Sequence, residues 1–132
     1  MGSSTPEPAP ARGPAGEAAA DRARLDTERA AILARLDALS HDFEAIVATA
    51  AEANGDDEHD PEGATVAFER SQVDALLHGA RAALARLDQA CSRLAAGTYG
   101  VCTRCGGPIG AERLEARPAA LTCMPCASAP SP

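Results

Sequence analysis

Four cysteines near the carboxyl end of the chain constrain its fold most strongly. They form two Cys-x-x-Cys pairs, Cys102 with Cys105 and Cys123 with Cys126, and 17 residues separate the two pairs. Each pair can present two thiolates to one ion, and two pairs complete a tetrahedral site. Thiolates suit zinc, and four protein ligands leave no position open for a catalytic water. We therefore predict one structural zinc ion held by these four cysteines.

Three other uses of the cysteines compete with zinc. Two disulfides would suit a secreted chain, but the amino terminus lacks the charged and then apolar layout of a signal peptide. A thioredoxin-like redox pair would need a strand and helix context that is missing, and nothing specifically supports an iron–sulfur cluster. Glycines follow the first pair at Gly106, Gly107 and Gly110. They favour a tight turn in which backbone amides approach the sulfurs, as in a zinc knuckle.

The chain upstream of the cysteines has the composition of thin helical packing. Of its 132 residues 45% are apolar, but alanine dominates, and there are only two Phe, one Tyr and no Trp. Large apolar residues recur at steps of three and four, which predicts two helices with one apolar seam each. The first seam consists of Leu25, Ile32, Leu36, Leu39, Phe43, Ile46 and Ala50. The second seam consists of Val66, Val73, Leu77, Ala80, Leu84, Leu87, Cys91 and Leu94.

Two helices of similar length joined by a short polar turn are expected to fold back antiparallel and to bury their seams against each other. The alternative, a homodimeric coiled coil of open helices, is disfavoured by the turn residues Pro61 and Gly63. Arg29 and Arg70 interrupt the seams, and each can lay its aliphatic stem along the interface with its charge in water. Cys91 lies on a seam and is expected to pack as a small hydrophobe, with redox sensing as the weaker alternative.

The predicted fold class is therefore mainly α: a long antiparallel coiled-coil hairpin followed by a small four-cysteine zinc finger. The expected parts are a disordered tail at 1–17, the hairpin at 18–96 with an acidic tip at 55–65, the finger at 97–127 and a flexible end at 128–132. The tail is rich in proline and small residues, which cannot bury enough apolar surface to order it.

The net charge and the apolar runs limit the partners of the chain. A formal net charge of −7 argues against broad affinity for nucleic acid, because that affinity comes from cations that neutralise phosphates. No apolar run approaches the length of a membrane span. The sequence thus predicts a soluble, cytoplasmic protein without a membrane partner, and we expect a monomer.

The stretch "GDDEHDPEGAT" between the seams carries five acids, Asp56, Asp57, Glu58, Asp60 and Glu62. Helix capping explains one or two of them, since Asp60 can cap a helix that begins at Pro61 and Glu62 favours the positive helix end. Five acids exceed that need and suggest a functional tip. A metal-dependent hydrolase is the rival class, but it needs carboxylates in a concave and partly dry pocket, whereas a hairpin tip is convex and wet. The three histidines, His41, His59 and His78, share no ligand spacing and are expected at the surface.

The run "GTYGVCTRCGGPIGAERLEARPAALTCMPCA" resembles the C4 zinc finger of the DksA/TraR family. The resemblance rests on its Gly-x-Tyr-Gly-x-Cys, Cys-Gly-x-x-Ile and Arg-Leu-x-Ala-x-Pro motifs, and with the hairpin it extends over residues 18 to 127. It implies a coiled coil joined to a zinc finger, and a bacterial transcription regulator that binds RNA polymerase directly without reading promoter DNA. It also implies that the coiled coil enters the secondary channel, that its acidic tip acts near the active site, and that the alarmone ppGpp can take part.

The resemblance also implies site residues, all of them binding rather than catalytic. At the tip they are Asp57, Asp60, Glu62, Ala64 and Thr65, and in the finger Arg113 and Arg117 are candidates for contact with the partner. The tip is one residue shorter than the family's Asp-Pro-x-Asp-x-Ala-Thr pattern, and Glu62 stands where the second aspartate is expected. The alternative function is a zinc-finger adaptor of the same fold that binds a different protein.

Overall fold

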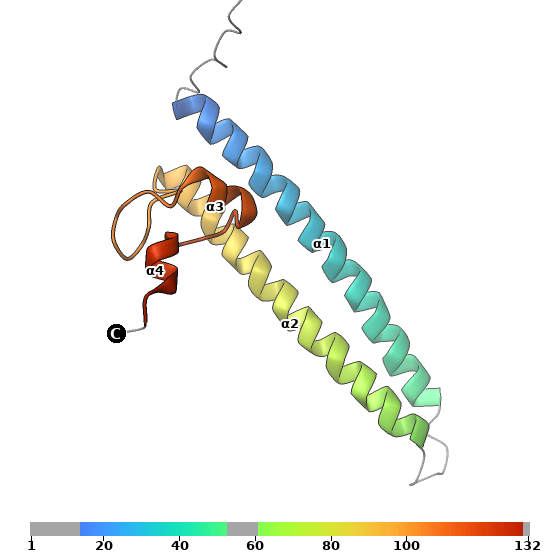
Figure 1. Ribbon diagram of the computed structural model, residues 1–132. Helices are drawn as coiled ribbons and strands as arrows, with labels where there is room; N and C mark the ends of the chain where they lie inside the picture. Colours follow the sequence, from blue (N-terminus) through green and yellow to red (C-terminus); the bar gives the residue numbers. More distant parts are fainter. Residues whose placement is uncertain (1–13, 53–60, 131–132) are drawn as a thin grey trace, which may run out of the picture. The chain divides into compact units, whose positions relative to one another are not determined.

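The computed structural model describes residues 14–52 and 61–130 (Figure 1). Its helices are α1 (Pro14–Glu52), α2 (Pro61–Ala96), α3 (Ala111–Ala116) and α4 (Met124–Ser128), and within those ranges the only β pairing is an isolated bridge between Val101 and Pro108. The predicted mainly α fold is confirmed. Helix α1 begins four residues earlier than expected, at Pro14, a residue type well suited to a first helical turn.

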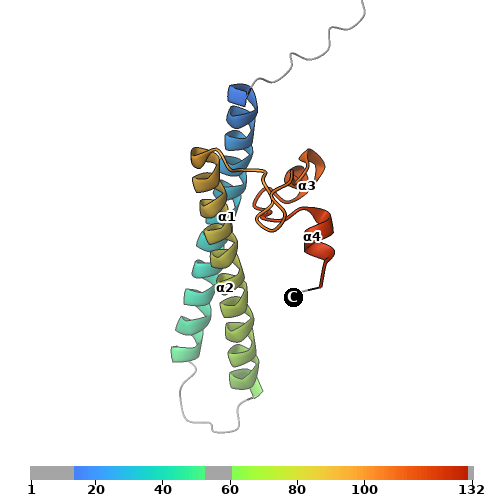
Figure 2. The same ribbon diagram turned by 90° about the vertical axis from the view of Figure 1, so that its left-hand side faces the viewer.

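The chain divides into two compact units. One unit runs from Glu28 to Asp88, and the other combines the residues up to Thr27 with those from Gln89 onward. In the first unit α1 and α2 lie side by side and antiparallel (Figures 1 and 2). Their core is formed by the buried Leu39, Leu77 and Ala80, against which Ile32, Leu36, Phe43 and Val73 pack.

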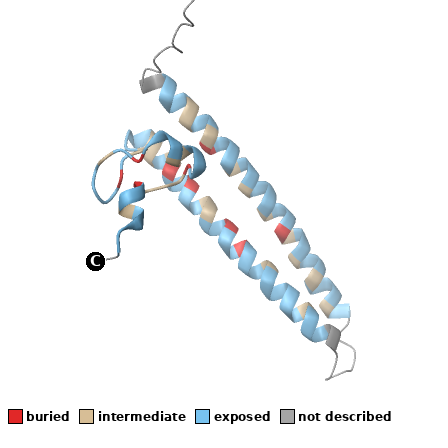
Figure 3. Ribbon diagram, in the orientation of Figure 1, coloured by how far each residue is buried: buried red, intermediate tan, exposed pale blue. Residues whose placement is uncertain are grey.

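Most buried positions of the two long helices lie on the predicted seams. Every residue of the two seams is buried or half-buried, whereas most other positions are exposed (Figure 3). Neighbouring apolar residues that lie off the seam remain exposed; Leu76 is 45% exposed while Leu77 is 4% exposed. Whether an apolar side chain of these helices is buried therefore depends on its place in the alternation of three and four residues, and not on its apolar character alone.

Each of the two arginines that interrupt the seams contacts a residue of the other long helix through its charged end. Arg29 donates from Nε to Asp88 Oδ1 at 3.0 Å, with both side chains about half exposed. The guanidinium of Arg70 lies over the ring of Phe43, 5.6 Å from its centroid. Both contacts are of the solvent-screened kind that contributes little individually.

The surfaces of the long helices are polar with scattered apolar residues. His41 and His78 are exposed and lie beside Asp37 and Asp74 one turn earlier, which confirms the prediction of surface histidines for these two. His59 lies outside the described residues. In the ranges that the structure describes, no helix is both long and apolar enough to cross a membrane.

In the second unit, helix α2 ends where the finger begins. The amide of Gly97 bonds to Leu94 O at 3.2 Å and that of Thr98 to Arg93 O at 2.9 Å, which is the paired pattern of a Schellman cap. Gly97 has φ 79°, a conformation that glycine adopts without steric cost. The Arg93 side chain then donates to Thr98 O at 3.0 Å, so the first residues after the helix are held by the helix itself.

Candidate metal centre

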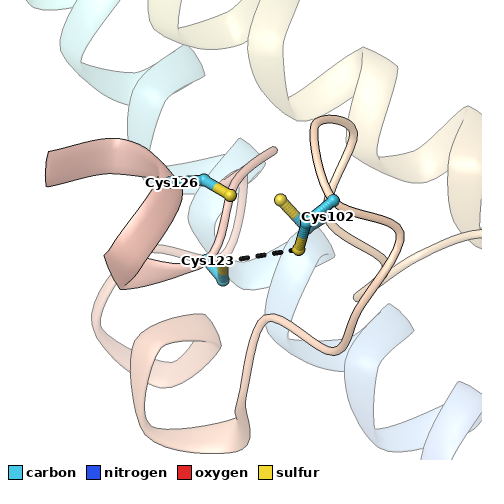
Figure 4. A group of neighbouring side chains, drawn as sticks. Cys102, Cys123 and Cys126 are labelled. Carbon is cyan, nitrogen blue, oxygen red and sulfur yellow. Dashed lines mark hydrogen bonds between the residues drawn. The ribbon is translucent and has the colours of Figure 1, made fainter. Parts of the chain in front are cut away.

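The four predicted ligands converge in the structure. The sulfurs of Cys102, Cys105, Cys123 and Cys126 all lie within 4.8 Å of one another. Figure 4 shows the side chains of Cys102, Cys123 and Cys126 pointing towards one another from different segments. The sulfurs of Cys105 and Cys123 are 3.8 Å apart. A tetrahedron with metal–sulfur distances of about 2.3 Å has edges of about 3.8 Å, so the spacing fits a zinc ion.

The first knuckle is a tight turn built on glycine. Cys102 donates its amide to Gly107 O at 2.8 Å, and Gly106 returns its amide to Cys102 O at 3.0 Å. Gly106 adopts φ 75°, which most residues avoid. The amide of Gly107 points at Cys105 Sγ at 3.4 Å. The predicted approach of backbone amides to the sulfurs is thus present.

The second knuckle lies at the start of a short helix. Cys123 is the residue before α4, and Pro125 is in the first turn of that helix, where its missing N–H costs nothing. The amide of Ala127 donates to Cys123 O at 2.9 Å, which closes the helical turn that contains Cys123 and Cys126. The sequence did not predict α3 or α4, because helices of five or six residues carry too few positions to show a period.

The two knuckles are linked by hydrogen bonds that do not pass through a metal. Thr103 donates its amide to Leu121 O at 2.9 Å and its hydroxyl to the same oxygen at 3.1 Å. Arg104 donates to Cys126 O at 3.0 Å. The residues between the first pair of cysteines thus bind the backbone around the second pair.

Arg113 also turns towards the second knuckle. Its Nε donates to Thr122 O at 2.7 Å, and its Nη1 lies 2.9 Å from Met124 Sδ. Arg117, the other arginine considered for partner contact, has an exposed side chain. The structure therefore gives Arg113 an internal role that the sequence did not reveal, and leaves Arg117 at the surface.

The family motifs of the finger contact each other. Tyr99 of the Gly-x-Tyr-Gly motif donates its hydroxyl to the carbonyl of Pro118, at 2.7 Å, and Pro118 ends the Arg-Leu-x-Ala-x-Pro motif. Gly100 accepts the amide of Ile109 at 2.8 Å, and Ile109 belongs to the finger core with Cys102 and Cys123. The three motifs are thus parts of one packed unit.

The thiols have unequal proton affinities. The backbone amide of Cys105, with a second contribution from that of Cys123, lowers the pKa of the Cys102 thiol to about 6. Hydrogen bonds with the sulfurs of Cys123 and Cys102 raise the pKa of the Cys126 thiol to about 12. Because zinc binds thiolates, metal binding must release the proton of the Cys126 thiol. The bond between zinc and the Cys126 sulfur offsets the free-energy cost of that deprotonation.

Most predicted tip residues cannot be compared with the structure. Asp57 and Asp60 lie outside the described residues, and Glu62 lies in the first turn of α2 without a described side chain. Ala64 and Thr65 follow in the same helix and are exposed. Cys91 is half-buried on α2, as expected for a seam position.

Comparison with known proteins identifies the finger. Residues 97–130 match the family described as the prokaryotic dksA/traR C4-type zinc finger. Residues 97–130 are thus a finger of the DksA/TraR type, and the three comparisons together support a DksA/TraR family protein. Over 40 residues it is 50% identical to a protein named RNA polymerase-binding transcription factor DksA in two strains of Caulobacter vibrioides. That match covers 30% of this chain and 28% of each relative, so the sequence similarity to them is confined to less than a third of either protein.

The similarity in structure extends further along the chain. The structure of transcription factor DksA2 from Pseudomonas aeruginosa matches this chain with a TM-score of 0.51 and 28% identity. The match covers 80% of this chain and 81% of DksA2. This chain and DksA2 therefore have a similar fold over most of their length. One zinc ion is the cofactor that the four clustered cysteines of this chain fit.

Proposed function

We propose that this chain regulates transcription by binding RNA polymerase directly. The observation that carries the proposal is the 50% identity, over 40 residues, to proteins named RNA polymerase-binding transcription factor DksA. The match in fold to DksA2 adds support, because its coverage of 80% of the chain exceeds the 34 residues of the finger at 97–130. On this proposal the protein is not an enzyme and works in the cytoplasm of a bacterium.

The hairpin end is the proposed working part. In the sequence, the acidic stretch 55–65 follows the end of α1 at Glu52 and runs into the first turns of α2. The chain carries a net charge of −7, which disfavours a direct role on DNA. We place this end in the secondary channel of polymerase, where Asp57, Asp60 and Glu62 would act near the catalytic magnesium. Ala64 and Thr65, exposed in the first turns of α2, would contact the channel wall.

The finger is the proposed base of the interaction. Cys102, Cys105, Cys123 and Cys126 would hold zinc, which supplies a rigid cross-link between the knuckles and no catalytic chemistry. Arg117 remains available for a partner because its side chain is exposed. A site for ppGpp at the interface with polymerase is part of the same proposal.

A binding experiment separates this function from that of an adaptor. Purified protein is titrated against bacterial RNA polymerase in co-sedimentation, with and without ppGpp, and a photo-crosslinker at Ala64 reports the contact. Saturable binding and a crosslink inside the secondary channel are expected. An adaptor for another protein would show no saturable binding, and a crosslink elsewhere on polymerase would refute the channel mechanism.

The tip mechanism needs a charge-matched control. Asp60→Asn with Glu62→Gln should abolish the effect on transcription while binding persists. Asp42→Asn with Glu44→Gln removes the same charge from exposed positions of α1 and should leave transcription effects unchanged. Equal behaviour of the two double variants would show that the tip carboxylates have no special role.

A further inference from the structure

We propose that Arg113 is a positioning residue for the zinc site and sets the rate at which the finger loses its metal. Its guanidinium contacts both neighbours of one ligand: Nε donates to Thr122 O at 2.7 Å and Nη1 lies 2.9 Å from Met124 Sδ. The ligand between those neighbours is Cys123, which is 8% exposed. Arg113 therefore fixes the chain on each side of a buried sulfur without touching the metal.

The backbone of Arg113 is itself held firmly. Arg113 lies in α3. Leu114, the residue after it, donates its amide to Gly110 O at 3.1 Å, and its side chain packs against the finger core. At the end of α3 the amide of Arg117 bonds to Arg113 O at 2.7 Å. A side chain that starts from a fixed backbone loses less freedom when it makes a contact, so its hydrogen bonds can impose a position on Thr122 and Met124.

The second knuckle depends on such outside support. Helix α4 has five residues, too few to be stable by itself, and Cys123 precedes it with an extended backbone and no side-chain cap. Thr103 and Arg104 hold the knuckle at Leu121 and Cys126. Arg113 supplies the guanidinium contacts on the residues directly beside Cys123.

Weaker support of a ligand translates into faster metal loss. When the Cys123 sulfur dissociates transiently, the tethered backbone keeps it close to the ion, and rebinding competes with escape. Removal of partners that orient metal ligands typically lowers metal affinity by about 10- to 100-fold. We expect a loss of that size when Arg113 can no longer donate, and we expect it mainly in the dissociation rate.

The experiment compares two arginines of the same segment in the full-length zinc-loaded protein. Arg113→Met keeps most of the aliphatic stem and removes the donors, while Arg117→Met makes the same change in charge at an exposed position. Zinc release is followed with a chromophoric chelator in excess. Arg113→Met should release zinc about 10- to 100-fold faster than the parent, and Arg117→Met should match the parent. Equal release rates for the two variants would overturn the proposal.

Two further measurements distinguish positioning from general folding. Far-ultraviolet circular dichroism of Arg113→Met should match that of the parent, and the cobalt-substituted protein should show a shifted ligand-field band because the Cys123 sulfur is displaced. If Arg113→Met fails to load metal, Arg113→Lys decides, because one donor can still reach Thr122 O. In that case, loading of Arg113→Lys supports positioning, and failure of both variants to load refutes it. Where both variants load zinc, slower release from Arg113→Lys than from Arg113→Met supports positioning, and equal release refutes it.

Discussion

The hairpin core can be tested with two adjacent leucines of α2. Leu77 is 4% exposed within the cluster that includes Leu39 and Ala80, whereas Leu76 is 45% exposed. Truncation to alanine removes three carbons at either site and changes helix propensity equally. At about 0.8 kcal/mol per buried carbon, Leu77→Ala should lose about 2.4 kcal/mol of unfolding free energy, with an increment of about 0.5 kcal/mol for a cavity that two helices can partly close.

The matched variant isolates burial from the other effects of the change. Because Leu76 is about half exposed, Leu76→Ala should lose only about 1 kcal/mol. Guanidinium titration followed at 222 nm, with zinc held constant, measures both values and should separate them by about 2 kcal/mol. A separation smaller than about 0.5 kcal/mol would lie within the error of extrapolation and would refute the assignment of Leu77 to the core.

Three further outcomes follow from contacts of single residues. Tyr99 is the only tyrosine of a chain without tryptophan, and burial, followed by the Asp21 carboxylate, raises its pKa above the usual 10. The absorbance titration of Tyr99 should therefore have a midpoint above 10 in the folded protein and near 10 in denaturant, and equal midpoints would contradict this. Because the raised pKa favours the neutral phenol in the folded state, the free energy of unfolding should fall as pH rises through the folded pKa. Chelation of zinc should move the folded midpoint towards 10 with most helical signal retained, as expected of a finger that needs its metal, and an unmoved midpoint would mean that the finger stays folded without it. A double-mutant cycle with Arg29→Met and Asp88→Asn should give a coupling below about 1 kcal/mol that vanishes at about 1 M salt, because both side chains are exposed; a larger coupling that survives salt would indicate a contact shielded from water.

The sequence predicted the repeated patterns and local motifs of this chain better than its individual side-chain contacts. The seams follow a period that repeats over many residues, so many positions independently indicate each helix and its buried face. The pattern also separates the buried Leu77, which is on a seam, from the exposed Leu76, which is not. The four ligands were predictable because a Cys-x-x-Cys pair is a local geometric unit. Whether Asp57, Asp60 and Glu62 form a working tip stays a prediction.

The contacts that a single sequence could not reveal are those in which a side chain meets a backbone carbonyl. Arg113 and Arg117 look alike in the sequence, yet only the fold brings Arg113 to Thr122. Tyr99 reaches Pro118 across 19 positions, and no pattern of residue types encodes which carbonyl will be nearby. Ala90, which belongs to the unit that contains the finger, lies off the predicted seam and is nevertheless 2% exposed.

The link between the knuckles has a consequence for how this finger can diverge. The carbonyl of Leu121 accepts a bond from the amide of Thr103 as well as from its hydroxyl. Every residue type except proline has a backbone N–H, so position 103 can change to any of these types while the main-chain bond survives. The outward side of the first knuckle is thus a place where new surface chemistry can arise by substitution without dismantling the metal site, which makes it a natural starting point for altering what the finger recognises.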